Sequence, residues 1–182
     1  MRDLVLTMGC SIDLMVSGGP DEDIGGGSQE HPDFIDRKLS WLSEAGVLGM
    51  GRGSYEEMAD FWQAADGDYA RWMNEKPKVV FSRTMERADW PTTRIAGGEL
   101  ADEVARLKAE PGGDILVFGG YRLAQALTRA RLVDEFRLQI RPVALGSGEP
   151  MFRDLERGQR LELVDCTPYP DGSVISIYRK PT

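Results

Sequence analysis

The sequence predicts a single α/β domain over residues 1–182, with a mixed, mostly parallel sheet, helices on both faces and a C-terminal antiparallel hairpin. Two observations predict this fold class. Short uninterrupted apolar runs alternate with amphipathic stretches through most of the chain, which is typical of parallel strands covered by helices. Towards the end, polar and apolar residues alternate one by one, which is typical of antiparallel strands. The length suits one domain, and 41% hydrophobic and 29% charged residues suit a globular one.

Strands and helices follow one another through the first part of the chain. Buried strands are predicted at 4–8, 47–50 and 78–82, with a short fourth strand at 93–97. Helices are predicted over 33–45, 54–62 and 99–109, where apolar residues recur every three or four positions. In the first of these helices, Ile35, Leu39 and Leu42 are spaced to form the buried face.

The stretch DILVFGGYRLAQAL, residues 114–127, joins a strand to a helix with no polar loop between them. Its apolar run ends at Gly119-Gly120, and Leu123, Leu127 and Ala130 then follow at helical spacing. The role of two adjacent glycines between this strand and this helix therefore needs a physical explanation.

Three further segments complete the predicted organisation. Residues 135–143 alternate between polar and apolar, and the two last strands flank Pro170-Asp171-Gly172, a hairpin turn signal. The longest irregular stretch is 17–33, and a loop of that length is more often functional or mobile than filler.

The composition excludes several classes of function. A net charge of −8 argues against nucleic acid as the main partner, and no apolar run approaches the length of a membrane span. The N-terminus makes a poor signal peptide, so a cytoplasmic protein is expected. The chain has one histidine, His31, and two distant cysteines, Cys10 and Cys166, so no metal site is expected.

The glycine pair suits a phosphate. In a parallel α/β sheet the ligand crevice lies beyond the carboxyl ends of the strands, and a helix that starts there directs unpaired N–H groups into it. Gly119 and Gly120 carry no side chain, so the backbone can approach a pyrophosphate closely. A tight strand-to-helix turn without any ligand is the alternative interpretation.

Two other strand ends carry similar chemistry. In VLGMGRGSYEEM, residues 47–58, Arg52 follows a glycine and has no evident helical or core role, which favours a phosphate contact. Ser54 and Glu57 also fit a capping box, so Ser54 can serve only to cap the helix. In FSRT, residues 81–84, two hydroxyls flank an arginine just past a strand, where a solvated loop is the alternative.

At this point the sequence resembles the dihydrofolate-reductase-like fold, and within it the reductase domain of bacterial riboflavin biosynthesis and its stand-alone relatives. The segments that carry the resemblance run in family order over nearly the whole chain: CSIDLMVSG (10–18), GMGRGSYE, VVFSRT, ILVFGGYRL and RPVALGSGEPMF (141–152).

The resemblance implies NADPH binding and hydride transfer to a small planar heterocycle or a related carbonyl or imine, with no nucleic-acid or membrane partner. Relatives are often dimers, so it also implies a homodimer. Carried over by position, the residues at the cofactor are Gly51, Arg52 and Ser54 at the phosphates, Ser82, Arg83 and Thr84 at the adenosine 2′-phosphate, and Gly119, Gly120, Tyr121, Arg122 and Leu123 at the pyrophosphate.

Two departures and two alternatives accompany the resemblance. Leu14 stands where the family usually has glycine, and the chain lacks the His and Cys residues of a fused zinc deaminase. A nucleotide-binding module or sensor without turnover remains an alternative, which a proton donor in the crevice would argue against. Folate reduction is less favoured, because the riboflavin-type stretch 141–152 is present.

Two carboxylates are candidates for the proton source. Asp33 begins the first long helix, where the related folate reductases carry an acid, but it also fits as a first-turn residue that the helix dipole favours. Asp13 matches the Ser-x-Asp of the riboflavin branch, and its alternative role is to stabilise a turn. Because the chain follows the riboflavin branch elsewhere, Asp13 ranks above Asp33 as the expected catalytic residue.

Overall fold

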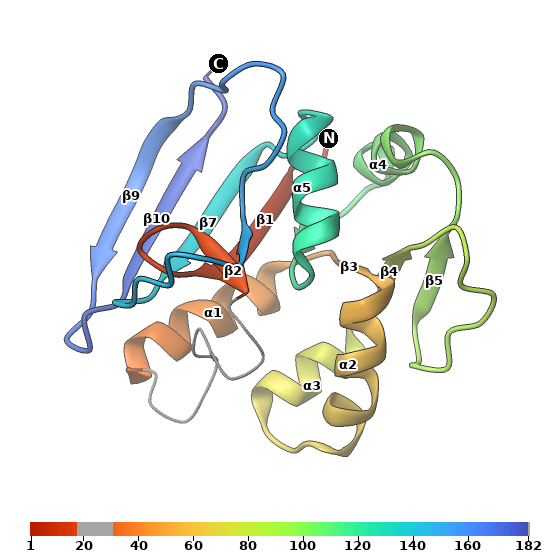
Figure 1. Cartoon of the computed structure of the whole chain (residues 1–182). Helices are drawn as coiled ribbons and strands as arrows, with labels where there is room; N and C mark the ends of the chain where they lie inside the picture. The colour runs from red at the N-terminus through yellow and green to blue at the C-terminus, as the bar shows by residue number, and fades with distance from the viewer. Residues whose placement is uncertain (18–30, 182) are drawn as a thin grey trace.

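The computed structural model describes residues 1–17 and 31–181 (Figure 1), so most of the irregular stretch predicted at 17–33 lies outside the described residues. The strands are β1 (Leu4–Cys10), β2 (Met15–Ser17), β3 (Val47–Gly51), β4 (Lys78–Phe81), β5 (Thr93–Ala96), β6 (Ile115–Val117), β7 (Glu135–Ile140), β8 (Glu149–Pro150), β9 (Glu162–Pro168) and β10 (Val174–Arg179). The helices are α1 (Pro32–Glu44), α2 (Arg52–Ala64), α3 (Asp68–Glu75), α4 (Leu100–Ala109) and α5 (Tyr121–Arg129).

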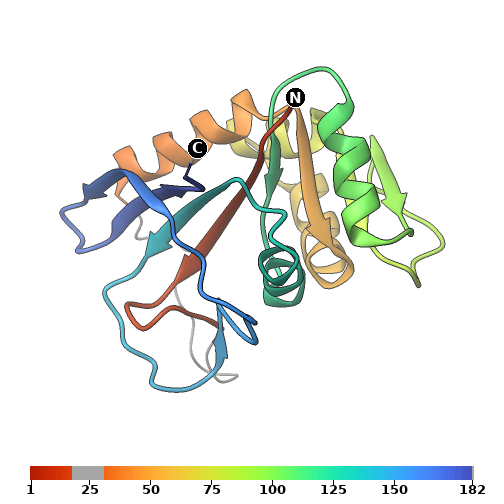
Figure 2. The same ribbon diagram turned by 90° about the horizontal axis from the view of Figure 1, so that it is seen from above.

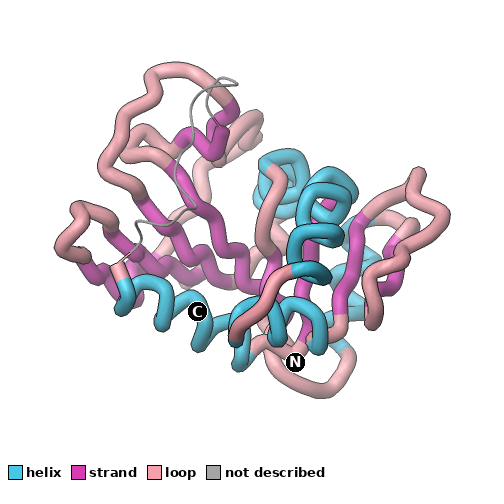
Figure 3. The backbone as a smooth tube through the Cα atoms, turned by 90° about the horizontal axis from the view of Figure 1, so that it is seen from below, coloured by secondary structure: helices cyan, strands magenta, loops and turns pink. Residues whose placement is uncertain are grey.

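The main sheet has eight strands in the order β5-β4-β3-β6-β1-β7-β10-β9. The strands from β5 to β7 run parallel, whereas β10 is antiparallel to both β7 and β9. Figure 3 shows these strands as one twisted surface with helices on both sides. The predicted class, a mostly parallel sheet ending in an antiparallel hairpin, is therefore confirmed.

Two apolar layers cover the two faces of this sheet. On one face α1, α2 and α3 pack over Val5, Leu48 and Val80. On the other face α4 and α5 pack over side chains that alternate with these along the same strands, among them Leu6 and Val79. Continuous apolar strands follow from this arrangement, because both faces of each central strand are buried.

Some predicted helix faces are wrong in detail. In α1 the buried residues are Phe34, Trp41 and Leu42, whereas Ile35 is 41% exposed. In α5 the predicted Ala130 lies at the exposed helix end, and buried Ala124 and Thr128 flank Leu127 on the core face. Apolar spacing located these helices, but the angle at which each one meets the sheet decides which neighbouring positions are covered.

Three elements have no counterpart in the sequence-based prediction. Helix α3 follows α2, and its Asn74 joins the two helices by donating from Nδ2 to the carbonyl of Trp62 at 2.8 Å. The short strands β2 and β8 pair with each other in a separate two-stranded sheet.

None of the described helices is long and apolar enough to cross a membrane.

The alternating segment 135–143 does not form the edge of the sheet. It contributes β7, which ends at Ile140 and lies between β1 and β10, and the true edge is β9. Two polar side chains of β7, Glu135 and Gln139, are buried because they have partners. Glu135 accepts from Arg137 at 2.6 Å and also from Arg179, so the alternation reflects paired polar groups.

Candidate functional site

A cavity of about 1070 Å³ opens at the carboxyl ends of the parallel strands. Gly51 at the end of β3, Phe81 at the end of β4 and Phe118 just past β6 all line it. Its position follows from the topology, because open α/β sheets form their ligand crevice at this edge.

Helices α2 and α5 both begin at this cavity, and Figure 2 shows them side by side. Gly51 is the N-cap of α2 and Gly120 is the N-cap of α5, and neither helix has a side-chain capping bond. The two N-termini are in close contact, since a Cβ built on Gly51 would lie 3.6 Å from Cβ of Leu123. The first N–H groups of two helices are thus available at one place, which is the chemistry that binds an anion.

The glycine pair Gly119-Gly120 has left-handed backbone geometry, with φ of +77° and +33°. It also packs against α2, because a Cβ on Gly119 would lie 2.5 Å from Oγ of Ser54 and one on Gly120 would lie 2.9 Å from it. A side chain at either position would therefore strain the turn and crowd Ser54, and its absence also leaves room for a close ligand. The turn interpretation accounts for this geometry, and the phosphate contact of the glycine pair stays a prediction.

The start of α2 differs from the prediction. The helix begins at Arg52 rather than near Ser54, so Ser54 is the third helical residue and the capping-box interpretation is wrong. The strand runs directly into the helix, and extended Gly51 takes the N-cap position instead. Buried Ser54 faces the glycine pair and lines the cavity.

Arg52 has a role within the helix that the sequence did not reveal. Its Nε donates to Oε1 of Glu56 at 2.7 Å, an i,i+4 ion pair on the exposed surface. Its Nη1 also donates to the hydroxyl of Thr84 at 3.3 Å, so Arg52 joins the first turn of α2 to the segment after β4. The side chain lines the cavity, and these two contacts hold its guanidinium at the rim.

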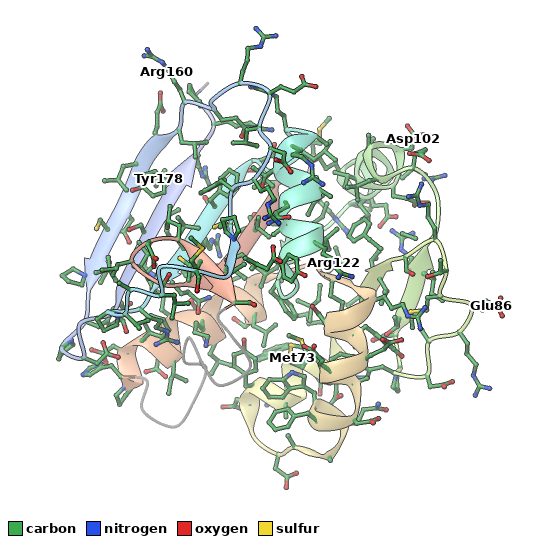
Figure 4. The ribbon with its side chains drawn as sticks, viewed as in Figure 1. Met73, Glu86, Asp102, Arg122, Arg160 and Tyr178 are labelled. Atoms are coloured by element: carbon green, nitrogen blue, oxygen red, sulfur yellow. The ribbon has the colours of Figure 1, made fainter. Side chains whose placement is uncertain are left out.

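Tyr121, Arg122 and Leu123 also line the cavity from the first turn of α5. Figure 4 shows Arg122 at the end of α5 that faces α2. Its guanidinium lies over the ring of Tyr121, with 5.6 Å between its Cζ and the ring centroid. Together with Arg52 it gives the rim two cations next to two helix N-termini.

The predicted 2′-phosphate segment, Ser82 to Thr84, lies beside the cavity and not among its lining residues. Ser82 Oγ accepts from the backbone N–H groups of Thr84 and Met85 at 3.3 and 3.1 Å, which fixes the turn after β4. Arg83 is 75% exposed and pairs with Glu99 at 3.7 Å. The contact of Arg52 with Thr84 is the link between this segment and the rim.

The floor of the cavity contains a polar pair that the sequence analysis missed. Gln139 in β7 donates from Nε2 to the hydroxyl of Thr7 in β1 at 2.8 Å, and both side chains are buried. Trp41 from α1 and Tyr69 from α3 line the same cavity, as does Lys38. The available signal was a glutamine inside an otherwise buried strand, since a buried amide needs a nearby partner.

Asp13 lies in the turn after β1, outside the lining of the cavity. Its carboxylate accepts from the Ser11 hydroxyl at 2.5 Å and from the backbone N–H groups of Leu145 and Gly146 at 3.1 and 2.7 Å. These bonds, the one from Ser11 first, lower the pKa of Asp13 to about 2. These contacts fit the turn-stabilising role of Asp13, and its catalytic role stays a prediction.

We expect Asp13→Asn to destabilise the fold in a pH-dependent way. The pKa of Asp13 is lowered on folding, so its contribution to stability is present above pH 3.8 and is lost as the pH falls towards 2. Urea unfolding of both proteins is the measurement. The difference in unfolding free energy should be constant between about pH 5 and 8 and shrink below about pH 4. A difference that does not change with pH would contradict this role for the ionised carboxylate.

Leu14, which stands where the family usually has glycine, adopts φ of +59°. The loop therefore keeps a glycine-like backbone although the residue is leucine. Its carbonyl accepts from the N–H of Met151 at 2.8 Å, and its side chain packs against the α4 and α5 layer. Packing offsets part of the strain of the left-handed conformation.

Asp33 is also remote from the cavity lining. It lies in the first turn of α1 with its side chain 79% exposed, and its backbone N–H donates to Nδ1 of His31, the N-cap residue, at 3.3 Å. The helix-dipole role accounts for this placement. The structure thus places both predicted acids outside the lining of the cavity.

Eight of the predicted cofactor residues do line this one cavity. They are Gly51, Arg52, Ser54, Gly119, Gly120, Tyr121, Arg122 and Leu123.

Comparison with known proteins gives one family and one fold. The sequence model of the RibD C-terminal domain family matches residues 41–175 of this chain. Two proteins of Bacillus subtilis (strain 168), both described as uncharacterized, are similar in sequence. YyaP is 33% identical over 143 residues, covering 76% of either chain, and YwjB is 41% identical over 143 residues, covering 70% of this chain and 79% of YwjB.

Solved structures match with lower sequence identity and establish the fold. A putative riboflavin biosynthesis protein from Shewanella sp. PV-4 superposes with a TM-score of 0.77 and 21% identity over 100% of both chains. The diaminohydroxyphosphoribosylaminopyrimidine deaminase/5-amino-6-(5-phosphoribosylamino)uracil reductase of Thermotoga maritima gives 0.69 and 11% identity. This chain is matched over 99% of its length but spans only 57% of that protein.

Proposed function

Because the chain belongs to the family of the RibD C-terminal domain, we propose that it is an NADPH-dependent reductase of a small planar heterocycle or a related carbonyl or imine. The observation that carries the proposal is the meeting of two helix N-termini, each with a glycine N-cap, at one cavity. Arg52 and Arg122 add two cations to the rim. These groups fit a dinucleotide pyrophosphate in charge and in access.

Different residues of this chain would bind different parts of the cofactor. Gly51, Gly119 and Gly120 would expose backbone N–H groups to the pyrophosphate, and Arg52 and Arg122 would add charge-assisted bonds. NADPH, when bound, supplies the hydride. Arg52 also reaches towards the 82–84 segment through Thr84, which supports a 2′-phosphate contact on that side.

The other end of the cavity suits a planar and partly polar substrate. Trp41 and Tyr69 offer aromatic surface, and such surface favours a flat ring. The Gln139 amide donates to Thr7, so the Thr7 hydroxyl keeps its own proton for an acceptor on the substrate. A buried, mutually bonded pair of this kind holds its geometry, which positions a heterocycle for reduction.

A nucleotide-binding module without turnover is the second candidate, and one observation favours it. Among the described residues that line the cavity, neither Asp13 nor Asp33 is present, so neither of the two acids predicted as the proton source lies in its wall. The discriminating measurement is the loss of NADPH absorbance during incubation with a panel of pyrimidine, pteridine and imine compounds. Cofactor binding without any NADPH consumption would favour the module.

We expect NADPH to bind more tightly than NADH, and Arg83→Ala to reduce that preference by about tenfold or more. A charge-assisted bond to a phosphate contributes about 1.5–3 kcal/mol, and 1.4 kcal/mol corresponds to about tenfold in affinity. Fluorescence titration with both cofactors measures the preference.

Arg87→Ala is the matched control, because Arg87 is another exposed arginine, paired with Asp89 as Arg83 is paired with Glu99. This variant should keep the preference of the wild type. Equal dissociation constants of the unmodified protein for NADPH and NADH would remove the 82–84 segment from the assignment.

A further inference from the structure

We propose that Gly9 determines which substrates the cavity admits, because its missing side chain leaves room for a planar ring on the cavity floor. This inference rests on the proposed reductase function and deepens it. Gly9 lies near the end of β1 and lines the cavity together with Thr7 and Gln139. Strand β1 is the neighbour of β6, whose end leads into the glycine pair, so a ring at Gly9 would lie next to the proposed cofactor site.

Neither the backbone nor the packing of the described residues explains a glycine at this position. Gly9 is not among the glycines with a positive φ, so other residues can adopt its extended conformation. A Cβ built on Gly9 meets no atom of the described residues within 4 Å, whereas one on Gly49 in β3 would lie 2.8 Å from Cγ2 of Val117. Glycine inside a strand weakens it and often marks a place where a ligand approaches the backbone closely.

The open space at Gly9 lies on the face of the sheet that α1 covers. Side chains alternate along a strand, so Val5, Thr7 and position 9 share one face of β1. Val5 belongs to the apolar layer beneath α1, α2 and α3, and Thr7 is also buried. Gly9 is exposed, so the covered part of this face ends there and the cavity begins.

The residues around Gly9 suit a flat ring with a polar edge. Gln139 is the register partner of Gly9 in β7, and its amide donates to the Thr7 hydroxyl at 2.8 Å. Trp41 and Leu42 of α1 add apolar surface to the same cavity. A ring over Gly9 would contact the strand backbone directly beside this polar pair, and a side chain at position 9 would take the place of the ring.

Fluorescence titration of the full chain with the pteridine lumazine, in the presence and in the absence of NADP⁺, tests the proposal. Lumazine is the probe because its two fused rings are planar and have polar edges. We expect saturable binding by the wild type, a loss of about tenfold or more in affinity for Gly9→Ala, and no detectable binding by Gly9→Val. A change of one methylene in a pocket alters selectivity by roughly 10–200-fold, and valine fills more of the space than alanine does.

Both variants should keep the affinity of the wild type for NADPH. Their melting temperatures should be at least as high as that of the wild type, because replacing a glycine in a compatible conformation restricts the unfolded chain. Gly158→Ala is the matched control, since a Cβ on Gly158 also meets no described atom within 4 Å and Gly158 lies outside the cavity lining. This control should bind lumazine as the wild type does.

Unchanged lumazine binding by Gly9→Ala and Gly9→Val would overturn the proposal, and so would a wild type that does not bind lumazine. A melting temperature of Gly9→Ala below that of the wild type would overturn it as well, because the glycine would then serve the fold. A wild type that binds lumazine but not NADPH would refute the proposed reductase function and leave the ring site at Gly9 in place.

Discussion

Gly120→Val is expected to abolish NADPH binding, by at least about a hundredfold in affinity, while the protein remains folded. The branched side chain would occupy the junction of α2 and α5, where a Cβ alone would already lie 2.9 Å from Oγ of Ser54. It would also block close approach of a pyrophosphate to the backbone. Gly120 has φ of +33° and ψ of +109°, outside the left-handed helical region, so valine there adds backbone strain of about 1–3 kcal/mol, which a domain of ordinary stability tolerates.

Gly67→Val provides the matched control for this strain. Gly67 is the N-cap of α3 with φ of +102°, and a Cβ built on it meets no atom within 4 Å. The control should show a comparable fall in melting temperature and unchanged affinity for NADPH. If Gly120→Val unfolds at ordinary temperature while Gly67→Val does not, the glycine pair serves the fold alone. If Gly120→Val binds NADPH normally, the pyrophosphate site lies elsewhere.

The glycine pair also shows what the sequence can and cannot predict. Its position after a buried strand and before a helix was evident from local pattern, and local pattern likewise located most strands and helices. The contact of Gly119 with Ser54 was not evident, because those residues lie far apart in the chain and meet only through the sheet order β3-β6. Side-chain duties that depend on such long-range contacts are the ones the sequence left open.

The same physical reason explains the missed polar residues. Gln139 was not among the predicted site residues, because its partner Thr7 lies in β1, at the other end of the sequence. Asp13 matched a motif, yet its carboxylate is held by the backbone of Leu145 and Gly146. In each case the residue type was visible, and the partner that decides its role came from a distant segment.

Lys78→Met is expected to destabilise the fold by about 3 kcal/mol, the largest effect on stability among these variants. The Lys78 side chain is only 1% exposed, and its amine donates to the carbonyls of Met73, Asn74 and Lys76 at 2.8–3.0 Å. Removing the amine leaves the carbonyls of Met73 and Asn74 without this donor at the end of α3, whereas the Lys76 carbonyl still accepts from the Thr92 hydroxyl. Each buried unpaired group costs about 1–3 kcal/mol. Relief from burying an ammonium group offsets part of that cost.

Thermal and urea unfolding of Lys78→Met at neutral pH measure the effect, with Lys76→Met as the matched control. Lys76 is half-buried and donates to the carbonyls of Ser43 and Ala45, so its loss lets water reach both acceptors, and a cost of about 1 kcal/mol is expected. For a chain of this length about 3 kcal/mol corresponds to a fall of roughly 6–12 °C in melting temperature. A fall no larger than that of the Lys76 control would contradict the assigned role.

The pH dependence gives this prediction a second, independent test. Burial lowers the pKa of Lys78 from 10.5 to about 8, so between these values the unfolded chain binds more protons than the folded one. Stability therefore rises with pH wherever this difference exists, and the wild type should gain stability relative to Lys78→Met between pH 8 and 10.5. A stability difference that stays constant over that window would mean that the amine keeps the pKa of an exposed lysine, and that the bonds to the end of α3 compensate fully for its burial.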